Sequence, residues 1–201
     1  MSTGKITVLA IVGVLLLGML SIGGWMIGTY NGMMTAKQDT QAKWGQVENQ
    51  MQRRGDLIPQ LVETVRGMGF QEQSVIDSVT SARAALAGAK SPAEKDAADR
   101  KVTVALSNLM GYTEAYPNLK SDKHFTDLMR EIAGTENRIA VARGDYNTSV
   151  QNYNVRIQRF PGTILAGMFG YQPMEQFKAD EAVKAVPKVD FNNLNGKAAK
   201  Q

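Results

Sequence analysis

Residues 6–27 read ITVLAIVGVLLLGMLSIGGWMI, an apolar run without a charged side chain, and the rest of the chain is patterned as helix. A helix of about 22 residues is roughly 33 Å long, whereas the hydrocarbon core of a bilayer is about 30 Å thick. The run therefore predicts a single membrane-spanning helix that anchors a helical domain.

A cleaved secretory signal is the alternative interpretation of this run. Lys5 supplies a minimal positive n-region, but the apolar region of a signal is normally about 7–15 residues long and no A-x-A-like cleavage site follows. Trp25 and Tyr30 stand where an interfacial aromatic belt is expected. We therefore favour an uncleaved anchor over residues 6–29, preceded by a short flank over residues 1–5.

Charge and cysteine content narrow the class of the domain that follows. The 201-residue chain has no cysteine, which excludes disulfides and thiol catalysis, and its formal net charge is +4. The basic side chains do not gather with aromatic ones, so we expect no nucleic-acid partner. Lys and Arg after the span favour a cytoplasmic domain, but large domains translocate regardless of such charges, so the side of the membrane stays open.

Helical periodicity begins soon after the anchor. Over residues 44–68 apolar side chains recur every three or four positions, and only Arg54 interrupts them. A break at Gly55, with Asp56 as N-cap and Pro59 in the first turn, is one interpretation of this segment. One long kinked helix that runs from the membrane through the segment is the other.

Further helices follow at short intervals. One covers residues 71–89, and Ser91, Pro92 and Glu94 form a capping signature that begins the next, which we expect to stop at Pro117. Ser121 or Asp122 caps a last helix of roughly 55 Å that ends at Phe160-Pro161-Gly162.

No segment alternates with the period of a strand, so the predicted fold is all-α. It consists of an N-terminal single transmembrane helix followed by an elongated antiparallel helical bundle with long coiled-coil-like helices. We place the bundle over residues 30–177 and a flexible tail over residues 178–201.

A specific segment, RRGDLIPQLVETVRG over residues 53–67, carries a family resemblance. Further matching positions include Tyr30-Asn31, Ala82-Arg83, Tyr116-Pro117-Asn118-Leu119-Lys120, Phe125, Leu128, Arg138-Ile139, Tyr146-Asn147, Val150, Tyr153-Asn154, Phe160-Pro161, Gly170-Tyr171 and Phe177. On these residues the chain resembles the LemA family of bacterial membrane-anchored helical proteins. The resemblance implies the same bundle in a bacterial cell (inner) membrane, and it brings no mechanism. Gly55 departs from the family pattern, which usually has a larger, often aromatic residue there.

The sequence offers little for catalysis. His124 is the only histidine, so no Glu-x-x-His pair, zinc cluster or Cys/His nucleophile can be assembled, and no Gly-x-x-x-x-Gly-Lys loop is present. We expect no catalytic residue, no cofactor, no metal site and no small-molecule substrate.

Seven polar residues match the family pattern and are candidate functional positions: Arg54, Asp56, Glu63, Glu131, Glu136, Arg138 and Arg143. They would either line a polar groove that binds a partner or an ion, or form ion pairs between neighbouring helices. We favour ion pairing, because such pairs often fix the register of packed helices.

Two segments are candidates for association. Gly24, Gly28 and Gly32 repeat every four residues on one face of the anchor, as in helices that pack closely in lipid, although glycine is common in any membrane helix. A short apolar segment with Ile164, Leu165, Met168, Phe169 and Tyr171 could dock onto a membrane, another subunit or a partner, or cap its own bundle.

Two classes of function are compatible with these features. The first is a non-enzymatic scaffold or adaptor in the lipid bilayer that forms a homo-oligomer and recruits another membrane protein. The second is a sensory or ligand-binding bundle, which would need a partner membrane protein because only about five residues precede the span. We favour the scaffold.

Overall fold

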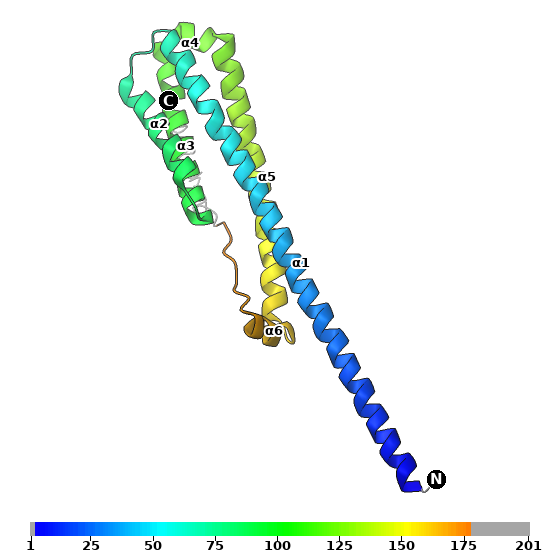
Figure 1. Cartoon of the computed structure of the whole chain (residues 1–201). Helices are drawn as coiled ribbons and strands as arrows, with labels where there is room; N and C mark the ends of the chain where they lie inside the picture. The colour runs from blue at the N-terminus through cyan, green and yellow to red at the C-terminus, as the bar shows by residue number, and fades with distance from the viewer. Residues whose placement is uncertain (1–2, 178–201) are drawn as a thin grey trace, which may run out of the picture.

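The computed structural model describes residues 3–177, and every regular element within them is a helix. Helix α1 (Thr3–Gly67) is the axis of the molecule, and its N-terminal part projects alone beyond the other elements (Figure 1). Helix α5 (Lys123–Gln158) runs along the C-terminal half of α1, beside the hairpin of α2 (Gln73–Gly88) and α3 (Pro92–Tyr112). The predicted all-α fold, a long apolar helix followed by an elongated antiparallel bundle, is confirmed.

The projecting part of α1 is covered with exposed apolar side chains. Leu17 is 66 % exposed and Leu20 73 %, because no other element of the described chain packs there. Within residues 3–177, α1 is the one helix long and apolar enough to cross a membrane, with a mean hydropathy of 2.1 over an 18-residue window. The predicted anchor over residues 6–29 lies in this segment.

Gly55 and Pro59 do not interrupt α1. Of the two interpretations of this segment, the structure therefore has the single long helix. A glycine costs about 1 kcal/mol and a proline about 3 kcal/mol inside a helix. Leu57, Ile58 and Leu61, which flank Pro59, are all buried in the core. Burial of such side chains contributes about 1.5–3 kcal/mol each, enough to offset both local penalties.

The hairpin of α2 and α3 begins and turns where the sequence predicted. Gly69 adopts φ +79°, a conformation that favours glycine, and reverses the chain after α1. At the start of α3, the Ser91 hydroxyl accepts a hydrogen bond from the Glu94 amide, and the Glu94 carboxylate accepts one from the Ser91 amide. This capping box satisfies amides that have no partner within the helix.

The chain leaves α3 earlier than the sequence predicted. Helix α3 ends at Tyr112 and is followed by the 3-10 turn η1 (Thr113–Ala115), and Pro117 then begins the short helix α4 (Pro117–Ser121). Proline disfavours the helical conformation in the residue before it, and Tyr116 accordingly has φ −124° and ψ 76°. Pro117 therefore starts a helix as its first residue, where its missing N–H costs nothing.

Helix α5 contributes the longest stripe of the core. The Asp122 carboxylate caps it by accepting a hydrogen bond from the Phe125 amide at 2.8 Å, and its 36 residues extend for about 54 Å. Its buried side chains contact α1 along most of this length. The helix ends at Gln158, just before Phe160-Pro161-Gly162, as the sequence predicted.

The last described elements lie near the middle of α1. Helix α6 (Gly162–Phe169) folds back against α1 and α5 (Figure 1). Residues 171–177, which we call the strap, then run in an extended conformation along α5. The predicted tail over residues 178–201 lies outside the described residues.

Candidate functional site

A cluster of charges with two buried members, Arg54 and Asp99, joins α1, α3 and α5. Arg54 interrupts the apolar stripe of α1, and its side chain is only 2 % exposed. Its Nη1 donates to Asp99 Oδ1 at 2.8 Å, and its Nη2 lies 2.5 Å from Glu136 Oε2. Arg143 Nη2 lies 2.8 Å from the second oxygen, Asp99 Oδ2. We call these four residues the arginine–carboxylate cluster.

The charged groups of this cluster are paired with groups of opposite sign. Burial raises the pKa of Asp99, and the guanidinium groups of Arg54 and Arg143 oppose that rise. Thr103 completes the environment, because its hydroxyl accepts from Arg54 Nη2 at 3.0 Å and donates to Glu136. Each carboxylate faces an arginine and no free general acid faces a free base, so the arrangement is suited to fixing helices.

A groove of about 740 Å³ opens beside the cluster, between α3 and α5. Asp96 and Arg100 lie on its α3 wall, where Arg100 Nη2 is 2.6 Å from Asp96 Oδ2. Arg143 Nη2 also reaches Asp96, at 3.2 Å. Within residues 3–177, no three His, Cys, Asp or Glu side chains gather as metal ligands would.

The structure brings together three of the seven predicted polar residues: Arg54, Glu136 and Arg143. Each of the three takes part in an ion pair between helices, and Glu136 and Arg143 also line the groove beside the cluster.

The other four predicted polar residues lie outside the cluster. Glu131 pairs with Arg53 at 2.7 Å on the surface, and Arg138 donates to the side chain of Gln50 at 3.2 Å. Asp56 and Glu63 are exposed on α1, and within residues 3–177 neither makes an ion pair.

Asp99 is the central carboxylate, and it is not among the residues predicted from the sequence. It follows Ala98 directly and precedes Val102 by three residues, so it lies next to the apolar stripe of α3. The sequence signal was a pair of charged residues at apolar stripes: Arg54 within the stripe of α1 and Asp99 beside the stripe of α3. One sequence alone does not say that these two residues face each other.

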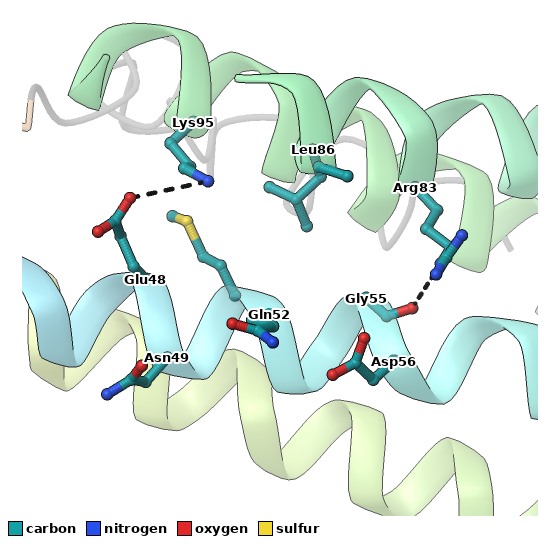
Figure 2. A pocket seen from close by; sticks show the side chains of 10 residues that line it. Glu48, Asn49, Gln52, Gly55, Asp56, Arg83, Leu86 and Lys95 are labelled. Atoms are coloured by element: carbon teal, nitrogen blue, oxygen red, sulfur yellow. Dashed lines mark hydrogen bonds and ion pairs between the residues drawn. The ribbon is translucent and has the colours of Figure 1, made fainter. Parts of the chain in front are cut away.

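A second polar site is the pocket in Figure 2, which has a volume of about 440 Å³ and lies between α1 and the α2–α3 hairpin. Its two cations have partners: Lys95 Nζ lies 3.9 Å from Glu48 Oε1, and Arg83 Nε donates to the carbonyl oxygen of Gly55 at 2.9 Å. Asp56 stands at the rim. A Cβ atom on Gly55 would meet nothing within 4 Å, so the missing side chain leaves the pocket open.

A repeated Tyr-Asn pair on α5 holds the strap through its backbone. Asn147 donates to the Phe177 carbonyl at 3.0 Å and accepts from the Phe177 amide at 2.8 Å. Asn154, seven residues later, makes the same two bonds with Met174, each at 2.9 Å. Seven helical residues rise about 10.5 Å, which matches three extended residues, so the two repeats are in register.

Aromatic side chains complete the seat of the strap. The hydroxyl groups of Tyr146 and Tyr153 donate to the carbonyls of Glu175 and Gln172. Burial, and for Tyr146 the nearby Glu175 carboxylate, raises the pKa of both phenols, so they stay protonated donors. Both Tyr-Asn pairs match the family pattern, and their spacing of seven residues was the sequence signal for a shared role.

The three anchor glycines have different surroundings. A Cβ atom on Gly24 or Gly28 would meet nothing within 4 Å. A Cβ atom on Gly32 would lie 3.1 Å from Nη1 of Arg156 on α5. Gly24 and Gly28 therefore remain open to a second helix, whereas Gly32 already belongs to the bundle.

The predicted docking segment contributes to the bundle with one face. Leu165 is buried, and Tyr171 is half-buried against α1, where its ring centroid lies 6.2 Å from that of Tyr30. Ile164, Met168 and Phe169 are exposed. The segment thus caps its own bundle and keeps an apolar face outside.

Comparison with known proteins finds relatives of this chain. The chain is 26 % identical over 205 residues to magnetosome proteins MamQ 1 and MamQ 2 of Paramagnetospirillum magneticum, covering 89 % of this chain and 75 % of each relative. It is 28 % identical over 174 residues to magnetosome protein MamQ of Magnetospirillum gryphiswaldense, covering 74 % of this chain and 64 % of the relative.

These relatives and the apolar helix α1 fit a membrane-associated helical protein. The LemA family profile matches residues 43–191, three quarters of the chain, including the whole arginine–carboxylate cluster and the strap. The chain belongs to the LemA family.

Proposed function

We propose that this protein is a non-enzymatic scaffold or adaptor, anchored by one span in a bacterial cell (inner) membrane, that self-associates and recruits other membrane proteins. The observation that carries the proposal is the continuity of α1. One helix of 65 residues forms both the apolar projection and the axis of the bundle. A bundle joined to its anchor without a linker is held at a fixed distance from the bilayer.

Rigidity within the bundle supports the same role. The arginine–carboxylate cluster ties α3 and α5 to α1, and an ion pair without its partner would leave a buried charge. Side-chain amides on α5 hold the strap at two points. A surface fixed in this way can present the same residues to a partner in every copy.

Self-association has a candidate surface in the anchor. Gly24 and Gly28 lie on one face of the projecting helix, and nothing in the described chain covers them. Small residues four positions apart let two helices approach closely in lipid, where packing drives association. Two anchors meeting at this face would place two bundles side by side.

Cysteine cross-linking in membranes tests this arrangement. The chain has no cysteine, so single cysteines at successive positions from 20 to 29 need no prior substitution. The proposal predicts oxidative cross-linking that peaks at positions 24 and 28 and falls between them. Uniformly weak cross-linking along the segment would contradict self-association through this face.

A ligand-binding bundle is the second candidate, and the pocket in Figure 2 favours it. Its volume of about 440 Å³ lies within the range of small-molecule sites, about 300–1,000 Å³. Asp56 at its rim, with Met51 and Leu86 in its wall, suits a small amine with an apolar body. Titration of the full-length protein with alkylamines tests this candidate: binding that Gly55→Trp abolishes supports it, and no detectable binding contradicts it.

A further inference from the structure

One end of the bundle carries an apolar surface that the core does not use. Helix α6 buries Leu165 and Ala166 against α1 and α5, so its place in the fold is fixed. Its other face is exposed, as is the aromatic residue just before it. The exposed fractions are 55 % for Ile164, 66 % for Met168, 56 % for Phe169 and 80 % for Phe160.

This surface lies where the anchor leaves the bundle. Met26, at the end of the apolar run, packs against the core cluster that contains Leu165 and Ala166. The ring of Tyr30 packs at a tilt against that of Phe169, with ring centroids 4.8 Å apart. Figure 1 shows α6 beside α1 at the point below which α1 continues alone. A bilayer that surrounds the projecting helix would therefore begin at the level of α6.

The charges at this end have one sign. No Asp or Glu occurs in residues 1–38 or 146–174, which include α6 and the part of α1 beside it. Lys37, Arg156 and Arg159 are the basic residues next to α6 in these ranges. Lys37 Nζ lies 5.5 Å from the ring centroid of Tyr171, and the Arg156 side chain reaches Gly32. An apolar face with adjoining cations is the composition of helices that lie in a bilayer interface.

We propose that α6 is a second membrane contact, an interfacial helix that places Ile164, Met168 and Phe169 in the bilayer surface while Arg156 and Arg159 face anionic headgroups. The inference rests on the membrane anchor of the proposed function. Lipid is the occupant because the surface is continuous with the span and meets the bilayer without any further partner. Two contacts, one spanning and one interfacial, fix the tilt and rotation of the bundle, which a single span does not.

Fluorescent labelling of single cysteines tests the inference in the full-length protein. Ile164→Cys and Met168→Cys carry an environment-sensitive dye in vesicles of phosphatidylcholine and phosphatidylglycerol, with and without spin-labelled lipid as quencher. Leu16→Cys in the apolar run is the positive control. Val141→Cys is the negative control, because this apolar side chain is 68 % exposed on α5, away from the membrane end.

The inference predicts blue-shifted emission and several-fold stronger lipid quenching at positions 164 and 168 than at 141. Quenching at 16 with none at 164 and 168 would overturn the interfacial helix and leave the anchor intact. Blue-shifted emission at 164 and 168 without lipid quenching would overturn it in favour of a protein partner or a second copy. No quenching at 16 would overturn the anchor, and the inference with it.

Discussion

Arg54 on α1 and Asp99 on α3 form an ion pair of 2.8 Å in which each side chain is only 2 % exposed. Arg54 lies in the apolar stripe that α1 presents to the bundle, between the buried Met51 and Ile58. Burial of a charge is costly unless a partner of opposite sign accompanies it. The pair therefore favours one alignment of α3 on α1, the one that brings Asp99 opposite Arg54.

Removing Asp99 tests this dependence. Asp99→Ala leaves Arg54 without its buried partner, and loss of one member of a buried pair costs about 3–5 kcal/mol. We expect the free energy of unfolding, from urea titration followed by circular dichroism, to fall by about that amount.

Glu131→Ala is the matched control for this substitution. It also removes a carboxylate that pairs with an arginine of α1, at 2.7 Å, but Glu131 and Arg53 lie on the surface. Surface pairs contribute about 0–1 kcal/mol. Equal losses of unfolding free energy in the two variants would show that burial of the Arg54–Asp99 pair does not contribute to stability.

Two glycine substitutions are expected to act in opposite directions. Gly55→Ala adds a methyl group inside α1 where nothing lies within 4 Å, and alanine is favoured over glycine in a helix by about 1 kcal/mol. Gly162→Ala places its Cβ on the backbone carbonyl oxygen of Arg156. Thermal unfolding should show a higher midpoint for the first variant and a lower one for the second. A shift of both unfolding midpoints in the same direction would contradict the packing described around these two glycines.

The strap should loosen when its side-chain amides are removed. Asn147→Ala and Asn154→Ala each delete two hydrogen bonds to the strap backbone, and such bonds contribute about 0.5–1.5 kcal/mol each. Hydrogen exchange at the amides of Met174 and Phe177 should accelerate. Asn152→Ala, an exposed asparagine on the same helix, is the control and should leave that exchange unchanged.

The capping box predicts a pH dependence of stability. Hydrogen bonds from the Lys90 and Ser91 amides lower the pKa of Glu94 below its ordinary value of 4.5. A carboxyl whose pKa is lowered on folding stabilises the fold above its unfolded pKa, and this contribution is lost as the pH falls through the folded value. Between neutral pH and the folded pKa, stability should therefore fall more in the native protein than in Glu94→Gln.

Comparison with Glu94→Gln separates this effect from other titrating groups. Burial raises the pKa of Asp99, so its contribution has the opposite sign and is lost as the pH rises through its folded value. Asp99 is present in both proteins and cancels in the difference. Identical pH profiles of unfolding free energy for the two proteins would show that the Glu94 bonds do not persist in solution.

Local signals predicted the elements of this fold well. The apolar run gave the projecting helix, and Ser91 with Glu94 gave the start of α3. Phe160-Pro161-Gly162 marked the end of α5. Each of these signals acts within a few residues of the chain, so the sequence alone contains the whole interaction.

Signals that depend on packing were less informative. Whether Gly55 and Pro59 interrupt α1 depends on whether burial of Leu57, Ile58 and Leu61 offsets the helix penalties of these two residues. That burial exists only in the folded bundle. Helix α3 was expected to continue to Pro117, but Tyr116 lies outside the helix because Pro117 restricts its backbone.

The candidate site could be predicted only in part for the same reason. Arg54 was visible as an interruption of an apolar stripe, and Arg143 and Glu136 as charges on α5. Asp99, 45 residues away from Arg54, is their common partner only because the hairpin folds back onto α1. The pocket beside Gly55 likewise exists only where α1 meets the folded α2–α3 hairpin.

The native mass of the full-length protein in mild detergent and in lipid nanodiscs tests the central proposal most directly. Gly24→Leu with Gly28→Leu blocks the open face of the anchor, and Gly18→Leu, on another face of the same helix and equally unobstructed, is the control. The scaffold proposal predicts a defined oligomer for the native protein and the control, and a smaller species for the double variant. A monomer for all three proteins in both media would contradict self-association and the scaffold built on it.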